Sequence, residues 1–212
     1  MRDNPRTPLL SALAGAVLLG GLVTFVLVLP DGEPEATSSE TSLPGEGNGS
    51  LELPDELEGG LVAVDLGTLP AELTEGFGDV ARLAEQEESI GDGLEETFGV
   101  PGAFRVYAAE DGSALAQVTA LDRAPGLFTP DALPIDPGVL GVERAQAELV
   151  KVDDAVCSLD WGAEVAAGQP VPADPPRAIR CQLGDGERTY ELTAQGLTPD
   201  EGAAVLQGLA DA

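Results

Sequence analysis

Histidine is absent from this chain of 212 residues, and lysine is nearly so, since Lys151 is its only example. The missing imidazole excludes Ser-His-Asp triads, histidine general bases and histidine-ligated metal centres. No glycine-rich loop precedes the lone lysine, so a Walker-type phosphate-binding loop is excluded as well. The sequence therefore predicts no cofactor and no metal site, and it favours a protein that is not an enzyme.

Basic residues are scarce as a class, because 10 Lys and Arg stand against 38 Asp and Glu, a formal net charge of −28. Proteins bind nucleic acids and anionic lipid headgroups by neutralising phosphates with Lys and Arg, so both are excluded as partners. Asp153, Asp154 and Asp160 lie near one another without the glycine and alternating oxygens of a calcium loop. We interpret the scattered acids as a solvated surface, and cation binding is the less favoured alternative.

Charge is missing altogether from residues 9–29, "LLSALAGAVLLGGLVTFVLVL". A helix needs about 20 apolar residues to cross a membrane, whereas the apolar part of a cleaved signal peptide is about 7–15 residues long. The sequence therefore predicts a single transmembrane anchor over 9–30. Arg2 and Arg6 precede it, which by the positive-inside rule predicts a cytoplasmic tail over 1–8 and an extracytoplasmic location for everything after the anchor.

Small residues recur every four positions along the predicted anchor. Such a stripe lets two helices approach closely, so a homodimer through the anchor is one interpretation, beside the common occurrence of small residues in any apolar helix. The stripe consists of Ala12, Ala16, Gly20 and Thr24.

Large apolar side chains are scarce in residues 31–50, "DGEPEATSSETSLPGEGNGS". A segment of this composition buries too little surface to offset the entropy of ordering, so we predict a disordered acidic linker. Its length would hold the next domain about 25 Å from the membrane. A folded domain is then expected over 51–212.

In residues 51–212, some segments show the two-residue apolar period of strands and others the 3.6-residue period of a helix. We expect a strand over 60–66 and a helix over 80–98 that Gly91 and Gly93 interrupt. Further strands are expected over 145–152 and 155–161.

Asp-Gly pairs indicate two β-hairpins. Asp111-Gly112 lies within 104–121 and Asp185-Gly186 within 179–194, and such pairs supply the positive φ that tight hairpin turns need. The chain ends in a predicted helix that begins at a capping box of Thr198 and Glu201, with proline at its first position. The fold class is therefore α+β, with a mostly antiparallel sheet and the helices packed on one face.

The chain has two cysteines, Cys157 and Cys181, and each falls in an apolar row of an expected strand. An even cysteine number in an oxidising compartment favours a structural disulfide between them, because redox catalysis would need close, exposed, electropositive thiols. Trp161, the only tryptophan, shares its row with Cys157, which favours core packing over a ligand platform. The opposite face of that strand carries Asp154, Ser158 and Asp160, and we expect any binding function of the strand there.

A short basic tail, one anchor, an acidic linker and a small disulfide-bearing domain together resemble single-pass envelope proteins of GC-rich Gram-positive bacteria. The resemblance is one of layout and implies a cell-membrane location, with no activity attached to it. The leading hypothesis is a non-catalytic binding or interaction module whose partner is an envelope protein or polymer. The alternatives are a carboxylate-dependent hydrolase of cell-wall polysaccharide and an accessory subunit of a larger membrane complex.

Overall fold

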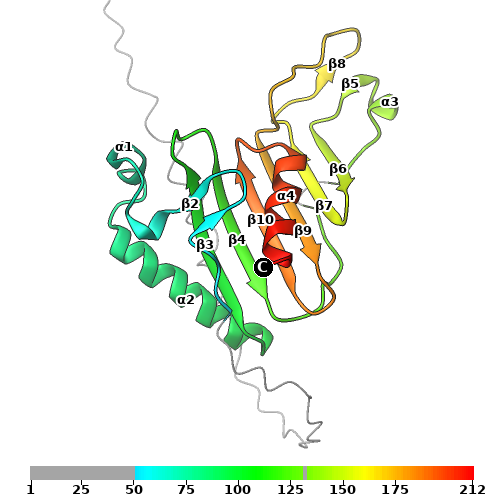
Figure 1. Ribbon diagram of the computed structural model, residues 1–212. Helices are drawn as coiled ribbons and strands as arrows, with labels where there is room; N and C mark the ends of the chain where they lie inside the picture. The colour runs from blue at the N-terminus through cyan, green and yellow to red at the C-terminus, as the bar shows by residue number, and fades with distance from the viewer. Residues whose placement is uncertain (1–50, 131–132) are drawn as a thin grey trace, which may run out of the picture. The chain divides into compact units, whose positions relative to one another are not determined.

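The computed structural model describes residues 51–130 and 133–212, so the predicted tail, anchor, small-residue stripe and linker lie outside the described residues. Within these two stretches, no helix is long and apolar enough to cross a membrane. The described residues form one large antiparallel sheet with two long helices (Figure 1). This confirms the prediction of a sheet-dominated α+β fold.

The large sheet has eight strands in the order β1-β2-β3-β4-β10-β9-β7-β6, and every neighbouring pair is antiparallel. A separate two-stranded ribbon pairs β5 with β8. The elements are β1 (Glu56–Leu57), β2 (Leu61–Ala63), the 3-10 helix η1 (Val64–Leu66), α1 (Ala71–Thr74), α2 (Val80–Phe98), β3 (Gly102–Ala109), β4 (Leu115–Leu121), α3 (Pro137–Leu140), β5 (Val142–Arg144), β6 (Ala147–Val152), β7 (Ala155–Asp160), β8 (Val165–Ala166), β9 (Ala178–Gly184), β10 (Thr189–Gln195) and α4 (Pro199–Ala210).

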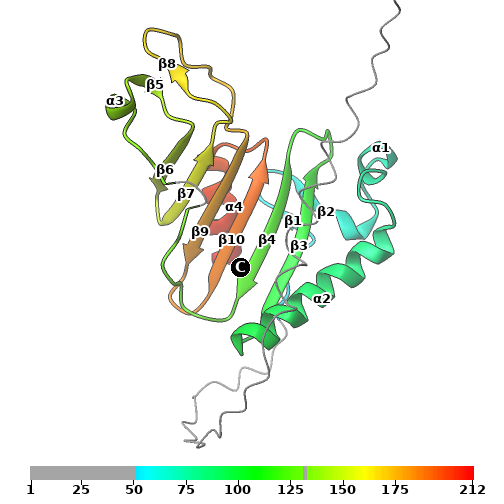
Figure 2. The ribbon, with the colours of Figure 1, turned by 180° about the vertical axis from the view of Figure 1, so that it is seen from behind.

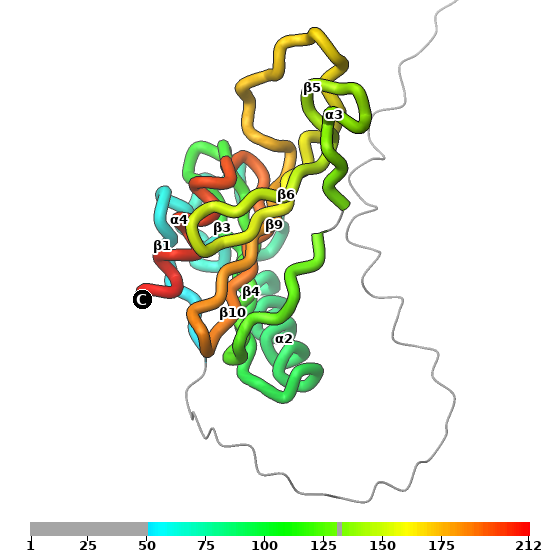
Figure 3. Tube along the Cα trace, turned by 90° about the vertical axis from the view of Figure 1, so that its right-hand side faces the viewer, coloured from blue at the N-terminus to red at the C-terminus, as the bar shows by residue number. Residues whose placement is uncertain are grey.

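The two long helices lie on opposite faces of the sheet, so the expectation that they share one face is wrong. Helix α4 lies in front of the sheet in Figure 1 and behind it in Figure 2, and Figure 3 shows α2 on the other side. Strand β3 explains the arrangement, because Tyr107 belongs to the core cluster beneath α4 while Val106 and Ala108 belong to a second cluster near α2. A strand that is apolar on both sides needs cover on both sides.

Both predicted hairpins are present, and β4 of the first pairs directly with β10 of the second. Their turn glycines, Gly112 and Gly186, have φ of 73° and 98°. The strand expected over 60–66 is shorter, since only Leu61–Ala63 is extended and Val64–Leu66 forms η1. This early end of β2 exposes part of β3.

Helix α2 runs without interruption, so the predicted break at Gly91 and Gly93 is wrong. Gly91 has a packing role, because a Cβ there would come within 3.1 Å of the carbonyl oxygen of Gly102. The glycine lets the helix approach the backbone of β3 closely.

Helix α4 begins at the predicted capping box and covers the disulfide. Thr198 and Glu201 make the reciprocal hydrogen bonds of the box. The disulfide joins Cys157 and Cys181 across directly paired positions of β7 and β9, which confirms that prediction. A Cβ on Gly202 would come within 3.3 Å of the Cys181 Sγ, so a small residue is needed where the helix crosses the bridge.

Candidate functional site: an acidic groove along the free edge of β3

The free edge of β3 arises because β2 covers only one end of that strand. Strand β2 pairs with Tyr107–Ala109, and the chain then turns away into η1. Gly102–Arg105 therefore pairs with β4 on one side only, and on the other side no described strand follows. An exposed strand edge presents a row of backbone donors and acceptors.

Strand alternation identifies which backbone groups of β3 face outward. Pro101 accepts from the backbone N–H of Asp122, and Ala109 donates to Ala114, so odd-numbered positions between them point toward β4. Even-numbered positions point away from it. The backbone groups of Gly102 and Phe104 therefore face away from β4, and the outward carbonyl oxygen of Gly102 is packed against Gly91 of α2.

A buried carboxylate ends this open stretch. Val106 N–H donates to Glu87 Oε1 of α2 at 2.8 Å, at the position where a longer β2 would have continued the ladder. Glu87 is only 6% exposed, and burial raises the pKa of its carboxyl group despite the hydrogen bond from Val106. Glu87 thus caps one backbone donor of the edge, and beyond it no described strand pairs with the outward side of β3.

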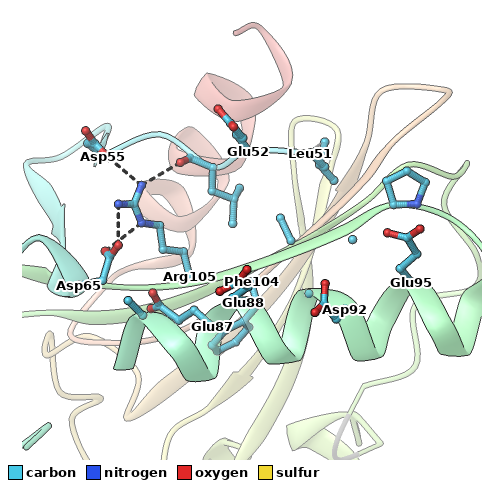
Figure 4. A pocket seen from close by; sticks show the side chains of 16 residues that line it. Leu51, Glu52, Asp55, Asp65, Glu87, Glu88, Asp92, Glu95, Phe104 and Arg105 are labelled. Atoms are coloured by element: carbon cyan, nitrogen blue, oxygen red, sulfur yellow. Dashed lines mark hydrogen bonds and ion pairs between the residues drawn. The ribbon is translucent and has the colours of Figure 1, made fainter. Parts of the chain in front are cut away.

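The groove has two chemically different walls (Figure 4). Helix α2 supplies the exposed carboxylates of Glu88, Asp92 and Glu95, and the segment before β1 supplies the half-buried side chains of Leu51 and Leu53. Gly102 and Phe104 of β3 lie between these walls, and the space measures about 760 Å³. This volume is in the range of about 300–1,000 Å³ that ligand pockets occupy.

The arginine that lines the groove has its charge matched by two aspartates. Arg105 lies 2.9 Å from Asp55 and 2.9 Å from Asp65, and it also donates to the Leu53 carbonyl oxygen at 2.9 Å. Burial alone would lower the pKa of Arg105, but the hydrogen bonds to the two aspartates outweigh burial and raise it. The guanidinium group therefore fixes the Leu53 wall and leaves the groove strongly negative.

The chemistry that this groove offers is attraction of positive charge. Among the described residues, no group of three or more Asp, Glu or Cys side chains is placed to hold a metal ion. The Glu87 carboxyl group has a raised pKa, which is a property of many general acids, but it is buried and bonded to the strand backbone. Its role in the structure is to hold α2 against β3.

The face that the sequence singled out on β7 lines a second, smaller pocket of about 450 Å³. Ser158 and Asp160 line it together with Arg180, whereas Asp154 lies in the turn at the other end of the strand. Asp160 binds Arg177, and despite partial burial this bond and one from the Gly162 N–H lower its pKa. Two of the three residues on the face that the sequence singled out therefore line a pocket, and the third does not.

Trp161 packs partly against the main core, as the sequence favoured. The guanidinium carbon of Arg144 lies 4.0 Å from the centre of the Trp161 ring, which is a cation-π contact. The Arg144 side chain is buried and the Trp161 side chain is half-buried. This contact was not predicted, because Arg144 lies on β5, outside every strand expected from the sequence.

The groove was also missed, and only a weak signal for it exists in the sequence. Glu88, Asp92 and Glu95 recur at helical spacing on one side of α2, but an acidic helix face is ordinary in so acidic a chain. Neither the free edge of β3 nor the position of Leu51 can be inferred before the strand order is known.

Comparison of the chain with protein-family models, with curated proteins and with solved structures finds no match. The geometry of the described residues is therefore the basis for inferring a function.

Proposed function

We propose that the protein is a membrane-anchored, extracytoplasmic and non-catalytic binding module of the cell envelope. Residues 9–30 would anchor it, and residues 51–212 would present the groove beside β3 to a positively charged partner. The observation that carries this proposal is the groove itself, which combines a free strand edge with the open carboxylates of Glu88, Asp92 and Glu95.

Two properties of the groove favour binding over catalysis. Its arginine is held by Asp55 and Asp65, and its buried acid, Glu87, is held by the backbone of β3. These groups are structural, and the remaining acids are exposed on a helix surface. An anionic surface of this kind speeds and strengthens association with cationic partners.

The test compares two triple variants of the full chain in lipid nanodiscs, each with three charges fewer. The groove variant is Glu88→Gln/Asp92→Asn/Glu95→Gln. The matched control is Glu110→Gln/Asp154→Asn/Glu187→Gln, which changes exposed acids in hairpin turns away from the groove. The probe is poly-lysine at physiological salt, measured by biolayer interferometry.

We expect the groove variant to bind poly-lysine about tenfold more weakly than the control, since three exposed ion pairs contribute about 0.2–1 kcal/mol each. Equal weakening in both variants would show attraction by net charge alone and would refute the groove as the site. Release of reducing ends from purified cell-wall polysaccharide by the wild-type protein would instead favour the hydrolase alternative.

The proposed location has its own measurement. Protease added to spheroplasts should remove residues 51–212 and leave a reporter fused to residue 1 intact. Protection of the domain would refute an extracytoplasmic location.

A further inference from the structure

The groove beside β3 has the form of a missing strand. The outward N–H groups of Gly102 and Phe104 and the Phe104 carbonyl group lie along its floor, at the place where β2 would have continued beyond Ala63, while Gly91 of α2 covers the Gly102 carbonyl oxygen. At about 3.3 Å per residue, the stretch Gly102–Arg105 is as long as roughly four residues of another extended chain. Addition of a strand to such an edge is a general mode of peptide recognition.

The two walls specify the side chains of that extended chain. Successive side chains of a strand point to opposite faces, so one set would face α2 and the other set would face the segment before β1. The α2 wall carries Glu88, Asp92 and Glu95, while the opposite wall carries Leu51 and Leu53. Alternation of basic and apolar residues matches both walls at once.

We propose that a partner protein binds here by adding an extended, cationic peptide segment as a strand to the free edge of β3. Its basic side chains at alternate positions face α2, and its apolar side chains face Leu51 and Leu53. This inference rests on the proposed function and specifies the kind of partner that the groove takes.

Charge argues against the other occupants. The linker over 31–50 of this chain contains no Lys or Arg and several acids, so α2 would repel it. A second copy that paired through its own β3 would bring two acidic α2 helices toward each other. Like charges opposed in this way disfavour both arrangements.

The probe is the capped peptide acetyl-Lys-Val-Lys-Val-Lys-Val-Lys-amide, titrated into the full chain in nanodiscs and followed by calorimetry. Two further peptides carry backbone N-methyl groups, one on every valine and the other on the internal lysines. In a paired strand only one of these two sets of N–H groups faces β3. Strand addition therefore predicts that one methylated peptide binds roughly tenfold more weakly, through loss of its N–H hydrogen bonds to the edge of β3, and that the other binds nearly as well as the parent.

Amide hydrogen exchange of the wild-type protein gives a second measurement without any substitution. With free peptide at ten times its Kd, exchange at Phe104 should slow by about tenfold, because its outward N–H becomes paired. Arg105 is the internal control, since its N–H already faces β4 and its exchange should not change.

The outcomes separate the two proposals. If both methylated peptides bind alike and Phe104 is not slowed, while the groove triple variant still loses affinity, strand addition is refuted and the binding groove stands. If the groove variant binds the parent peptide as well as the matched control does, both proposals fail. A concentration-dependent dimer of the protein that slows Phe104 exchange without peptide would also overturn the inference, because the occupant would be a second copy.

Discussion

Loss of the disulfide should cost the folded domain a large share of its stability. Cys157 and Cys181 are 24 positions apart, and closing a loop of that length removes chain entropy from the unfolded state worth about 3.5 kcal/mol at 25 °C. Both cysteines are also fully buried, and the Cys181 sulfur lies beneath Gly202 of α4. The double variant Cys157→Ala/Cys181→Ala therefore loses the cross-link and leaves a small cavity.

Three forms of the protein separate these two effects. The oxidised wild type, the wild type refolded under reducing conditions and the double alanine variant are each unfolded in urea and followed by circular dichroism. The difference between the oxidised and the reduced wild type measures the cross-link alone, with an expected loss of about 3.5 kcal/mol of unfolding free energy. The difference between the reduced wild type and the alanine variant measures lost packing. For a domain of this size, loss of the cross-link corresponds to a fall in Tm of about 7–14 °C.

The same experiment contains an internal check. A cross-link keeps the unfolded state compact, so the urea dependence of the unfolding free energy should be steeper in the reduced and alanine forms. Equal unfolding free energies for the oxidised and reduced wild type would refute the loop-entropy argument. Free thiols that react with an alkylating reagent in the folded, untreated protein would refute the bridge itself.

Three further substitutions test other contacts. Glu87→Gln keeps an acceptor for Val106 N–H and removes the titration. Because burial raises the folded pKa of Glu87 above its ordinary value of 4.5, the wild type should lose unfolding free energy relative to this variant as pH rises above about 4.5. Parallel pH profiles of the two proteins in urea unfolding would contradict this. Gly196→Ala should destabilise by about 1–3 kcal/mol, since φ is 80° and a Cβ would collide with the Ser113 carbonyl; Gly126→Ala, in open space, should not. Thr198→Ala should lower the unfolding free energy by about 1 kcal/mol through loss of the N-cap of α4. An unchanged urea midpoint would show that the capping box contributes nothing.

Local sequence patterns predicted the parts of the fold that depend on residues close together in the chain. The Asp-Gly turns, the alternation that turns Cys157 and Cys181 to one side, and the box at Thr198 each depend on spacings of a few residues. Such short-range signals do not depend on which strands or helices become neighbours in the folded domain. They were enough to predict both hairpins, the disulfide and the final helix.

The helix α2 shows where local patterns mislead. Glycine lowers intrinsic helix propensity, which predicted a break at Gly91 and Gly93. Packing against Gly102 outweighed that cost, because absence of a side chain at Gly91 lets the helix approach β3. Strand β3 is apolar on both faces, so a helix packs on each face of the sheet. The sequence pattern of one strand does not show which helix packs on which face.

The sequence by itself determined the absence of histidine chemistry, the strong negative charge, the anchor prediction and the elements whose signals are local. Only the tertiary structure decided the groove, because its parts come from distant segments: Asp65 meets Arg105 across 40 positions and Leu53 meets it across 52. The end of β2 at Ala63 leaves the edge of β3 free, and that edge exists only once the strand order is set. Contacts between such remote residues follow from how the sheet assembles, and no spacing along the chain encodes them.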